Sequence, residues 1–188
     1  NKPGIKISKL NGGVLGGSMK QGTLKVGDEI EIKPGLKREN QDKWDALTTK
    51  ITGLNSGNES VKEITPGGSA GILTELDPSI VKSDILSGNL VGLKDKLPNV
   101  YMQLSLKPTL LKRVVGVKDD LLVENIKEGE VLMLNVNSAA TVGKVVDTRK
   151  GVVSLQLKLP VCMEKSDRVT ISRQIGARWR LIGYGVMV

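Results

Sequence analysis

The stretch that decides the fold is residues 22–32, which reads Gly22-Thr23-Leu24-Lys25-Val26-Gly27-Asp28-Glu29-Ile30-Glu31-Ile32. It joins two short apolar segments through a glycine turn, and residues 13–18 contain another apolar pair between glycines just before it. Alternation of apolar and polar residues buries one face of a strand, and glycine supplies the tight turns between strands. The stretch therefore predicts short strands joined by tight turns.

The same pattern continues on both sides of a linker at Lys94-Asp95-Lys96-Leu97-Pro98. Before it, β-like segments are predicted at residues 48–54, 61–64, 70–73 and 85–93, and a polar hairpin loop at 36–47. After it, they are predicted at 100–106, 130–137, 141–147, 151–159, 168–173 and 179–188. Pro108 is expected to end the first of these strands, and residues 110–115 are compatible with a helical turn or a strand. The prediction is an all-β chain of two consecutive small β-barrels, residues 1–97 and 98–188.

The charge of the chain favours anionic partners. It has 188 residues, with 28 Lys and Arg against 20 Asp and Glu, a formal net charge of +8. Residues 1–97 hold 14 basic and 12 acidic side chains, whereas residues 98–188 hold 14 and 8. Nucleic acid is the commonest reason for such an excess, and a merely basic soluble surface is the alternative. With aromatics at 2%, we expect contacts to phosphates rather than stacked bases.

The sequence lacks residues and motifs that several classes of active site require. The chain has no histidine, one cysteine, Cys162, and no phosphate-binding G-x-x-x-x-G-K-[ST] motif. Histidine-dependent nucleophiles, zinc sites and a Walker-type nucleotide cradle are therefore not expected. The loose G-x-G spacing within residues 12–17 is interpreted as turn and bulge glycines, and Glu29 and Glu31 as an exposed strand face. We expect no catalytic, cofactor-binding or metal-binding residue in this chain.

The location of the protein is predicted from what the sequence contains. A single cysteine gives no internal disulfide, which favours the cytoplasm. No run approaches the roughly 18–20 apolar residues of a membrane span, so no membrane partner is expected. Since the chain starts at Asn1, without Met or a signal-peptide pattern, we expect it to be a piece of a larger protein.

A cluster of three arginines near the end of the chain is the first candidate for RNA contact. Arg173, Arg178 and Arg180 lie in β-like segments, and strand alternation puts Arg178 and Arg180 on one face. Trp179 and Leu181 then take the other face. Guanidinium groups suit phosphate through bidentate hydrogen bonds. The alternative is a solvated face above a core tryptophan.

Residues 22–32, with residues 13–18 before them, resemble the second-domain signature of translational GTPases. Other segments are similar to one family of that group, the gamma subunit of eukaryotic and archaeal translation initiation factor two. They are Asn1-Lys2-Pro3-Gly4, Gly12-Gly13-Val14, residues 29–35, Pro66-Gly67-Gly68, Leu76-Asp77-Pro78, residues 129–133, Pro160-Val161-Cys162, Ser172-Arg173 and residues 178–185.

The resemblance implies that residues 1–97 are domain two and residues 98–188 domain three, with a GTP-binding domain missing upstream. GTP and Mg²⁺ would bind in that missing domain. In the family, the subunit binds methionylated initiator tRNA, domain two docks the alpha subunit, the GTPase domain receives the beta subunit, and domain three faces the small ribosomal subunit. The implied function is a non-catalytic barrel module of the factor that delivers initiator tRNA.

Two further sets of residues follow from the resemblance as hypotheses. The turn with Gly67 and Gly68 is similar to one that holds the tRNA end in elongation factor Tu, but Gly68 stands where that factor carries a carboxylate. Backbone groups of these glycines are therefore expected to approach the tRNA end or the first domain. The polar hairpin loop at residues 36–47 is expected to contact a partner protein or RNA through Lys37, Arg38, Lys43 and Trp44.

Three other readings stay open at this point. The chain is compatible with a domain pair of another tRNA-delivering GTPase, of the selenocysteine-specific elongation factor type. It is also compatible with an unrelated basic RNA-binding barrel whose second half alone carries function. An enzyme would need a pair of carboxylates with perturbed pKa values in a cleft.

Overall fold

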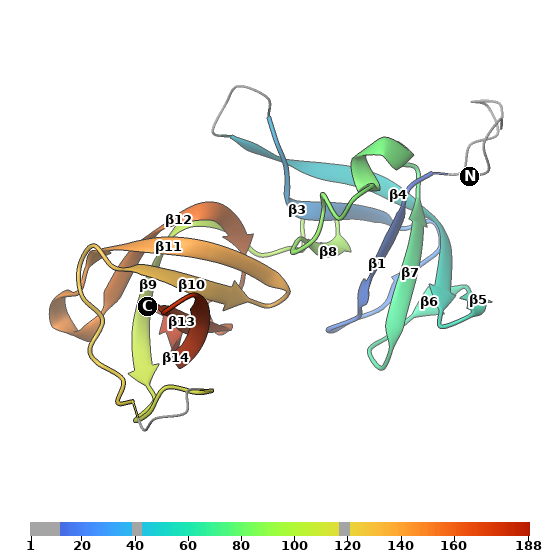
Figure 1. Ribbon diagram of the computed structural model, residues 1–188. Coiled ribbons are helices and arrows are strands. Elements are labelled where there is room, and N and C mark those ends of the chain that lie inside the picture. The colour runs from blue at the N-terminus through green and yellow to red at the C-terminus, as the bar shows by residue number, and fades with distance from the viewer. Residues whose placement is uncertain (1–11, 39–42, 117–120) are drawn as a thin grey trace. The chain divides into compact units, whose positions relative to one another are not determined.

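The computed structural model describes residues 12–38, 43–116 and 121–188. The chain divides into two compact units, Asn1–Leu97 and Pro98–Val188, here called the first and second unit (Figure 1). The division falls within the segment with the linker pattern. Both units are built of strands, so the prediction of an all-β chain is confirmed.

The first unit is an antiparallel half-barrel sheet with a small second sheet. In the described part of the unit, the main sheet has the order β1-β7-β4-β3-β8, and β5 pairs with β4; β2 pairs separately with β6. Ile30, Ile51 and Leu54 are buried in its core, and Glu29 and Glu31 alternate with buried Ile30 and Ile32. The strands are β1 (Val14–Ser18), β2 (Leu24–Lys25), β3 (Glu29–Lys37), β4 (Trp44–Ser56), β5 (Glu59–Val61), β6 (Glu63–Ile64), β7 (Ser69–Thr74) and β8 (Leu90–Leu93).

Two predictions about the first unit were wrong at their boundaries. Both ends of the expected loop over residues 36–47 are strand, because β3 continues to Lys37 and β4 begins at Trp44, which is paired with Lys37. Residues 39–42 lie outside the described part. The strand expected at 85–93 is shorter, since residues before Leu90 form turns closed by backbone hydrogen bonds such as that from the Ser87 N–H to the Asp84 carbonyl, 2.8 Å.

The second unit is a closed six-stranded barrel with the order β10-β11-β12-β9-β14-β13 (Figure 1). Inward side chains of every strand form one core, in which Leu106, Leu132, Leu134 and Ile182 are fully buried. The strands are β9 (Val100–Leu110), β10 (Val131–Val136), β11 (Ala139–Asp147), β12 (Val153–Cys162), β13 (Arg168–Ile175) and β14 (Arg178–Met187). Among the described residues, short 3-10 helices are η2 (Pro78–Val81) in the first unit and η3 (Arg149–Gly151) in the second.

The prediction that Pro108 ends its strand was also wrong. Strand β9 runs to Leu110, and Pro108 lies opposite Gly185 of β14. Proline lacks an N–H and is tolerated where a strand has a free edge. The register of β9 with β12 ends at Leu106, so Pro108 has a strand partner on one side only. Beyond it, the Leu111 N–H donates to the Ile182 carbonyl at 2.8 Å and Arg113 forms a β-bridge with Leu122, so these residues of the undecided 110–115 segment are paired as in strands.

In the part of the chain that the structure describes, no helix has the length and apolar character needed to cross a membrane.

Candidate functional site

The three arginines of the sequence cluster come together on the β13–β14 hairpin of the second unit. Arg173 lies directly opposite Arg180, and Ile175 opposite Arg178. Residues opposite each other on paired strands project from the same face, so all three arginines share one face. Trp179 and Leu181 take the other face, where Trp179 is half-buried and Leu181 is 36% exposed. The alternative of a core tryptophan is therefore wrong.

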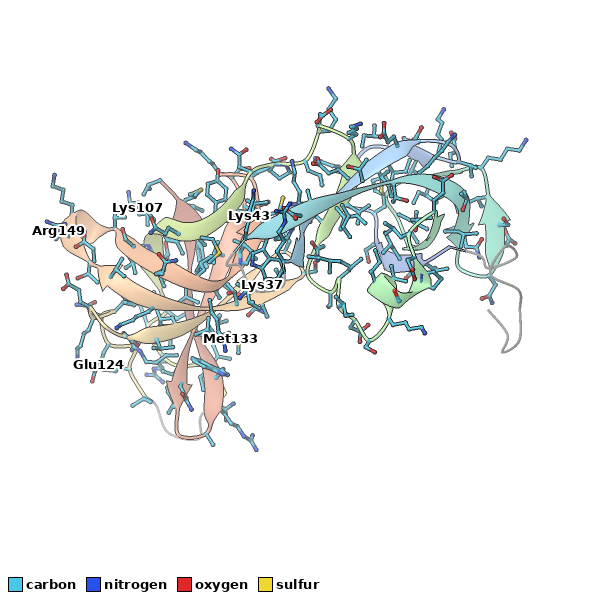
Figure 2. All side chains as sticks on the ribbon, turned by 90° about the horizontal axis from the view of Figure 1, so that it is seen from above. Lys37, Lys43, Lys107, Glu124, Met133 and Arg149 are labelled. Carbon is cyan, nitrogen blue, oxygen red and sulfur yellow. The ribbon has the colours of Figure 1, made fainter. Side chains whose placement is uncertain are left out.

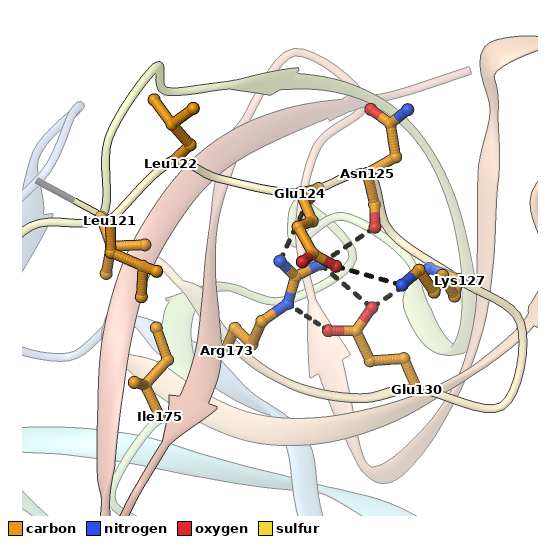
Figure 3. Close-up of a pocket in the computed structure, with 9 residues that line it drawn as sticks. Leu121, Leu122, Glu124, Asn125, Lys127, Glu130, Arg173 and Ile175 are labelled. Atoms are coloured by element: carbon orange, nitrogen blue, oxygen red, sulfur yellow. Dashed lines mark hydrogen bonds and ion pairs between the residues drawn. The ribbon is translucent and has the colours of Figure 1, made fainter.

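The Arg173 side chain is paired with groups of its own barrel. Its guanidinium forms an ion pair with Glu130, in which Nη2 donates to Oε2 at 3.2 Å. It also donates to the backbone carbonyls of Glu124, at 3.1 Å, and Asn125, at 3.3 Å (Figure 3). Both side chains of the pair are only 19% exposed. The structure thus gives Arg173 the role of fastening the 124–130 segment to the barrel, and RNA contact by this residue stays a prediction.

A pocket of about 340 Å³ lies beside this ion pair (Figure 3). Its apolar lining comes from Val114, Leu121, Leu122 and Ile175, and its charged lining consists of Glu124, Lys127, Glu130 and Arg173. The Lys127 ammonium donates to Glu124 at 3.1 Å, and this hydrogen bond, with the positive charges of Lys127 and Arg173, holds the pKa of Glu124 below its ordinary value. The charged groups of the pocket are thus paired with one another, an arrangement suited to structure rather than to acid–base catalysis.

Arg178 and Arg180 differ from Arg173 in their surroundings. Arg178 is exposed and Arg180 is half-buried. The Arg180 side chain lies over the backbone of Gly116, because a Cβ added at that glycine would be 2.7 Å from Nη1 of the arginine. RNA contact by Arg178 and Arg180 stays a prediction.

Gly67 and Gly68 lie in an exposed turn between β6 and β7 of the first unit. Gly67 has a φ of +134°, and a Cβ added at either glycine meets nothing within 4 Å. Strand β7 follows, paired with β1 at the end of the sheet order, where Gly16 and Gly17 also have open space at the Cβ position. We call Gly16, Gly17, Gly67 and Gly68 the glycine surface; a partner can approach its backbone closely.

The interpretation of residues 12–17 as turn and bulge glycines is wrong for Gly16 and Gly17. They are residues of strand β1, paired with Gly71 and Ala70. The signal that could have found them is their position directly after Val14-Leu15 in a β-like segment. The approach of Gly67 and Gly68 to a tRNA end or to the first domain stays a prediction.

The four predicted partner residues of the first unit gather where the β3–β4 hairpin ends. Lys37 is paired with Trp44, and the Arg38 N–H donates to the Lys43 carbonyl at 2.9 Å. The Arg38 guanidinium forms an ion pair with Asp45. Lys37 and Lys43 lie close together in this region of the hairpin (Figure 2). Strand pairing thus brings the four residues into one region, and their contact with a partner stays a prediction.

Across residues 12–38, 43–116 and 121–188, no group of three or more histidine, cysteine, aspartate or glutamate side chains is arranged to hold a metal ion.

Comparison with known proteins gives the family. Residues 12–91 match the family described as elongation factor Tu domain 2, and residues 102–187 match initiation factor eIF2 gamma, C terminal. A translation initiation factor 2 subunit gamma from Methanococcus maripaludis is 53% identical over 190 residues, which cover 100% of this chain and 46% of that protein. Over its whole length the chain is homologous to gamma subunits of translation initiation factor 2. The matched regions are β-barrel domains of a translational GTPase and not its catalytic domain.

Other gamma-family members agree with this assignment. The subunit from Pyrococcus horikoshii is 52% identical over 189 residues, covering 100% of this chain and 46% of that protein. The one from Thermococcus kodakarensis is 52% identical, covering 98% and 46%. The chain therefore spans about half the length of the curated relatives it matches. The crystal structure of a bacterial selenocysteine-specific elongation factor has a similar fold, with a TM-score of 0.68, 22% identity and coverage of 95% of this chain and 25% of that one.

Proposed function

We propose that this chain acts in translation initiation, as the non-catalytic barrel module of an initiation factor 2 gamma subunit. The observation that carries the proposal is identity of about half of the residues to gamma subunits over the whole length of the chain. In the longer protein, GTP and Mg²⁺ would bind outside these residues. A cytoplasmic location accompanies this role.

The two units would serve as a platform for partners. In this proposal the first unit docks the alpha subunit and contributes to a groove for methionyl initiator tRNA, which a GTP-binding domain completes when it closes. The beta subunit meets the GTP-binding domain, and the second unit faces the small ribosomal subunit.

The test of the proposal measures three ligands on the 188-residue chain by titration calorimetry. The chain is expected to bind the alpha subunit, to give no heat with GTP, and to bind methionyl initiator tRNA only weakly, because the groove would be incomplete. If the chain does not bind the alpha subunit although its circular dichroism shows a folded β protein, the result would contradict the proposal.

A substitution at Gly68 tests the glycine surface. Gly68→Val is expected to change the free energy of unfolding by less than about 0.5 kcal/mol, because the space at its Cβ position is open. In a full-length gamma subunit, the same change is expected to weaken initiator-tRNA binding, measured by filter binding with GTP present. Ser60→Val, on exposed β5, is the matched control. Unchanged tRNA affinity with normal folding would contradict a role for Gly68.

A further inference from the structure

The strands of the second unit carry an unequal distribution of charge. Within its described residues, the six strands hold one acidic side chain, Asp147, which is paired with Arg149 at 2.8 Å. The same strands hold seven basic side chains: Lys107, Lys144, Lys158, Arg168, Arg173, Arg178 and Arg180. The other described acidic residues of this unit, Glu124, Glu128, Glu130, Glu164 and Asp167, lie in the connections between strands.

The first unit shows that this distribution is not general to the chain. Its strands mix both signs, with acidic residues Glu29, Glu31, Asp45, Glu59 and Glu63 and basic residues Lys25, Lys33, Lys37 and Lys50. Near-exclusion of carboxylates is therefore a property of the barrel wall of the second unit.

Strand register gathers one part of this wall into a continuous face over β9, β14 and β13. Lys107 lies opposite Val186, which lies opposite Arg168; Thr109 lies opposite Tyr184, which lies opposite Thr170. Leu106, next to Lys107, and Val169, between Arg168 and Thr170, are fully buried, so this set points outward. We call Lys107, Thr109, Arg168, Thr170 and Tyr184 the wall face.

The wall face combines two cations with hydroxyl groups. The Lys107 and Arg168 side chains are exposed, and their backbones are two strand spacings apart, about 9–10 Å, which suits contact with separate phosphates. Arg168 stacks on the Tyr184 ring, 5.2 Å from the ring centroid. Thr109 and Thr170 add hydroxyl donors. The nearby carboxylate of Asp167 accepts hydrogen bonds from the Asn137 side-chain amide and the Glu164 N–H, both at 3.0 Å.

We propose that the wall face binds the sugar–phosphate backbone of double-stranded RNA, without reading its sequence. The proposal rests on the proposed function in translation and names a binding surface for RNA. A convex wall with cations and hydroxyls fits the wide, shallow minor groove of an RNA helix, where phosphates and 2′-hydroxyls are exposed.

Single-stranded RNA and an acidic protein fit this face less well. Single strands are bound chiefly by stacking bases on free aromatic rings, and Arg168 already covers Tyr184. Protein interfaces are built around apolar or aromatic anchors, and Val186, half-buried between Lys107 and Arg168, is the aliphatic residue in this part of the wall.

The experiment compares two pairs of substitutions in the whole 188-residue chain. Lys107→Gln/Arg168→Gln removes the cations of the wall face, and Lys144→Gln/Lys158→Gln removes the same charge from β11 and β12. Binding to a short blunt RNA duplex is measured by fluorescence anisotropy over a series of salt concentrations. The first pair is expected to weaken binding about tenfold or more and to reduce the salt slope by about 1 per lost phosphate contact. The second pair is expected to change affinity less than about threefold, as a nonspecific charge effect.

Three results would overturn the proposal. Equal losses in the two pairs would show that only net charge matters. Equal or tighter binding of the matching single strand would assign the face to unpaired RNA, and binding of polyglutamate in preference to the duplex would assign it to an acidic protein. Alpha-subunit binding is the separate readout. If the unaltered chain does not bind the alpha subunit, the result counts against the proposed function. If it does bind the alpha subunit, and Lys107→Gln/Arg168→Gln binds the duplex as tightly as the unaltered chain, the result counts against the wall face alone.

Discussion

Replacing Gly35 with alanine is expected to lower the free energy of unfolding of the first unit by about 3 kcal/mol or more. Gly35 has a φ of +89°, and a Cβ at this position would lie 1.8 Å from the Asp45 carbonyl oxygen. The left-handed backbone conformation costs a residue other than glycine about 1–2 kcal/mol, and forcing extra volume into a packed site costs about 1–3 kcal/mol more. β3 and β4 would have to separate where Leu36 pairs with Asp45.

Hydrogen exchange of the β3 and β4 amides in increasing urea measures this loss directly. Gly57→Ala is the matched control, because Gly57 also has a positive φ, +59°, but open space at the Cβ position. The control is expected to lose only about 1 kcal/mol. If the two substitutions have the same effect, the close approach of Gly35 to Asp45 is not what requires a glycine there.

Replacing Arg173 with leucine is expected to destabilise the second unit by about 2–3 kcal/mol, because it leaves the largely buried Glu130 carboxylate without its cation. Two backbone carbonyls, of Glu124 and Asn125, lose their donors as well. Amides at residues 124–127 are expected to exchange faster. Urea unfolding followed by the fluorescence of Trp179, which lies on the adjacent strand, reports the change.

Arg178→Leu is the control on the same hairpin, since Arg178 is exposed; its effect is expected to stay within about 0.5 kcal/mol. The double variant Arg173→Leu/Glu130→Leu is expected to recover part of the loss, because it removes the unpaired carboxylate. Should Arg173→Leu keep its stability and lose RNA binding instead, the RNA contact predicted from sequence would be right and the fastening role wrong.

Local patterns predicted the parts of the fold in which strand alternation decides burial. Ile30 and Ile32 alternate with charged neighbours, and both are fully buried. The predicted strand boundaries were wrong where pairing with another strand decides whether a residue lies in a strand. Pro108 remains within a strand because the β12 ladder has already ended at Leu106, and Lys37 is in a strand because Trp44 pairs with it. Neither fact is visible in the residues around the position itself.

The same distinction explains the candidate sites. Alternation correctly placed Arg178 and Arg180 on one face of a strand. It gave no partner for Arg173, because Glu130 is 43 residues away in the sequence. The wall face was missed because charge was counted over each half of the chain. The basic excess of the second unit is concentrated in its strands, and most of its described acidic residues lie in the connections between them. A separate count of charges for strands and connections would have revealed the wall face.

The placement of charge on the barrel wall also has a consequence for the speed of encounter. Cations along the sides and a near balance of charges in the connections give the barrel an electric field that is directional rather than uniform. Such a field would turn the approaching barrel so that its side, and not its end, meets a polyanion first. Because electrostatic steering acts before contact, loss of the lysines and arginines on the sides would slow association more than it speeds dissociation.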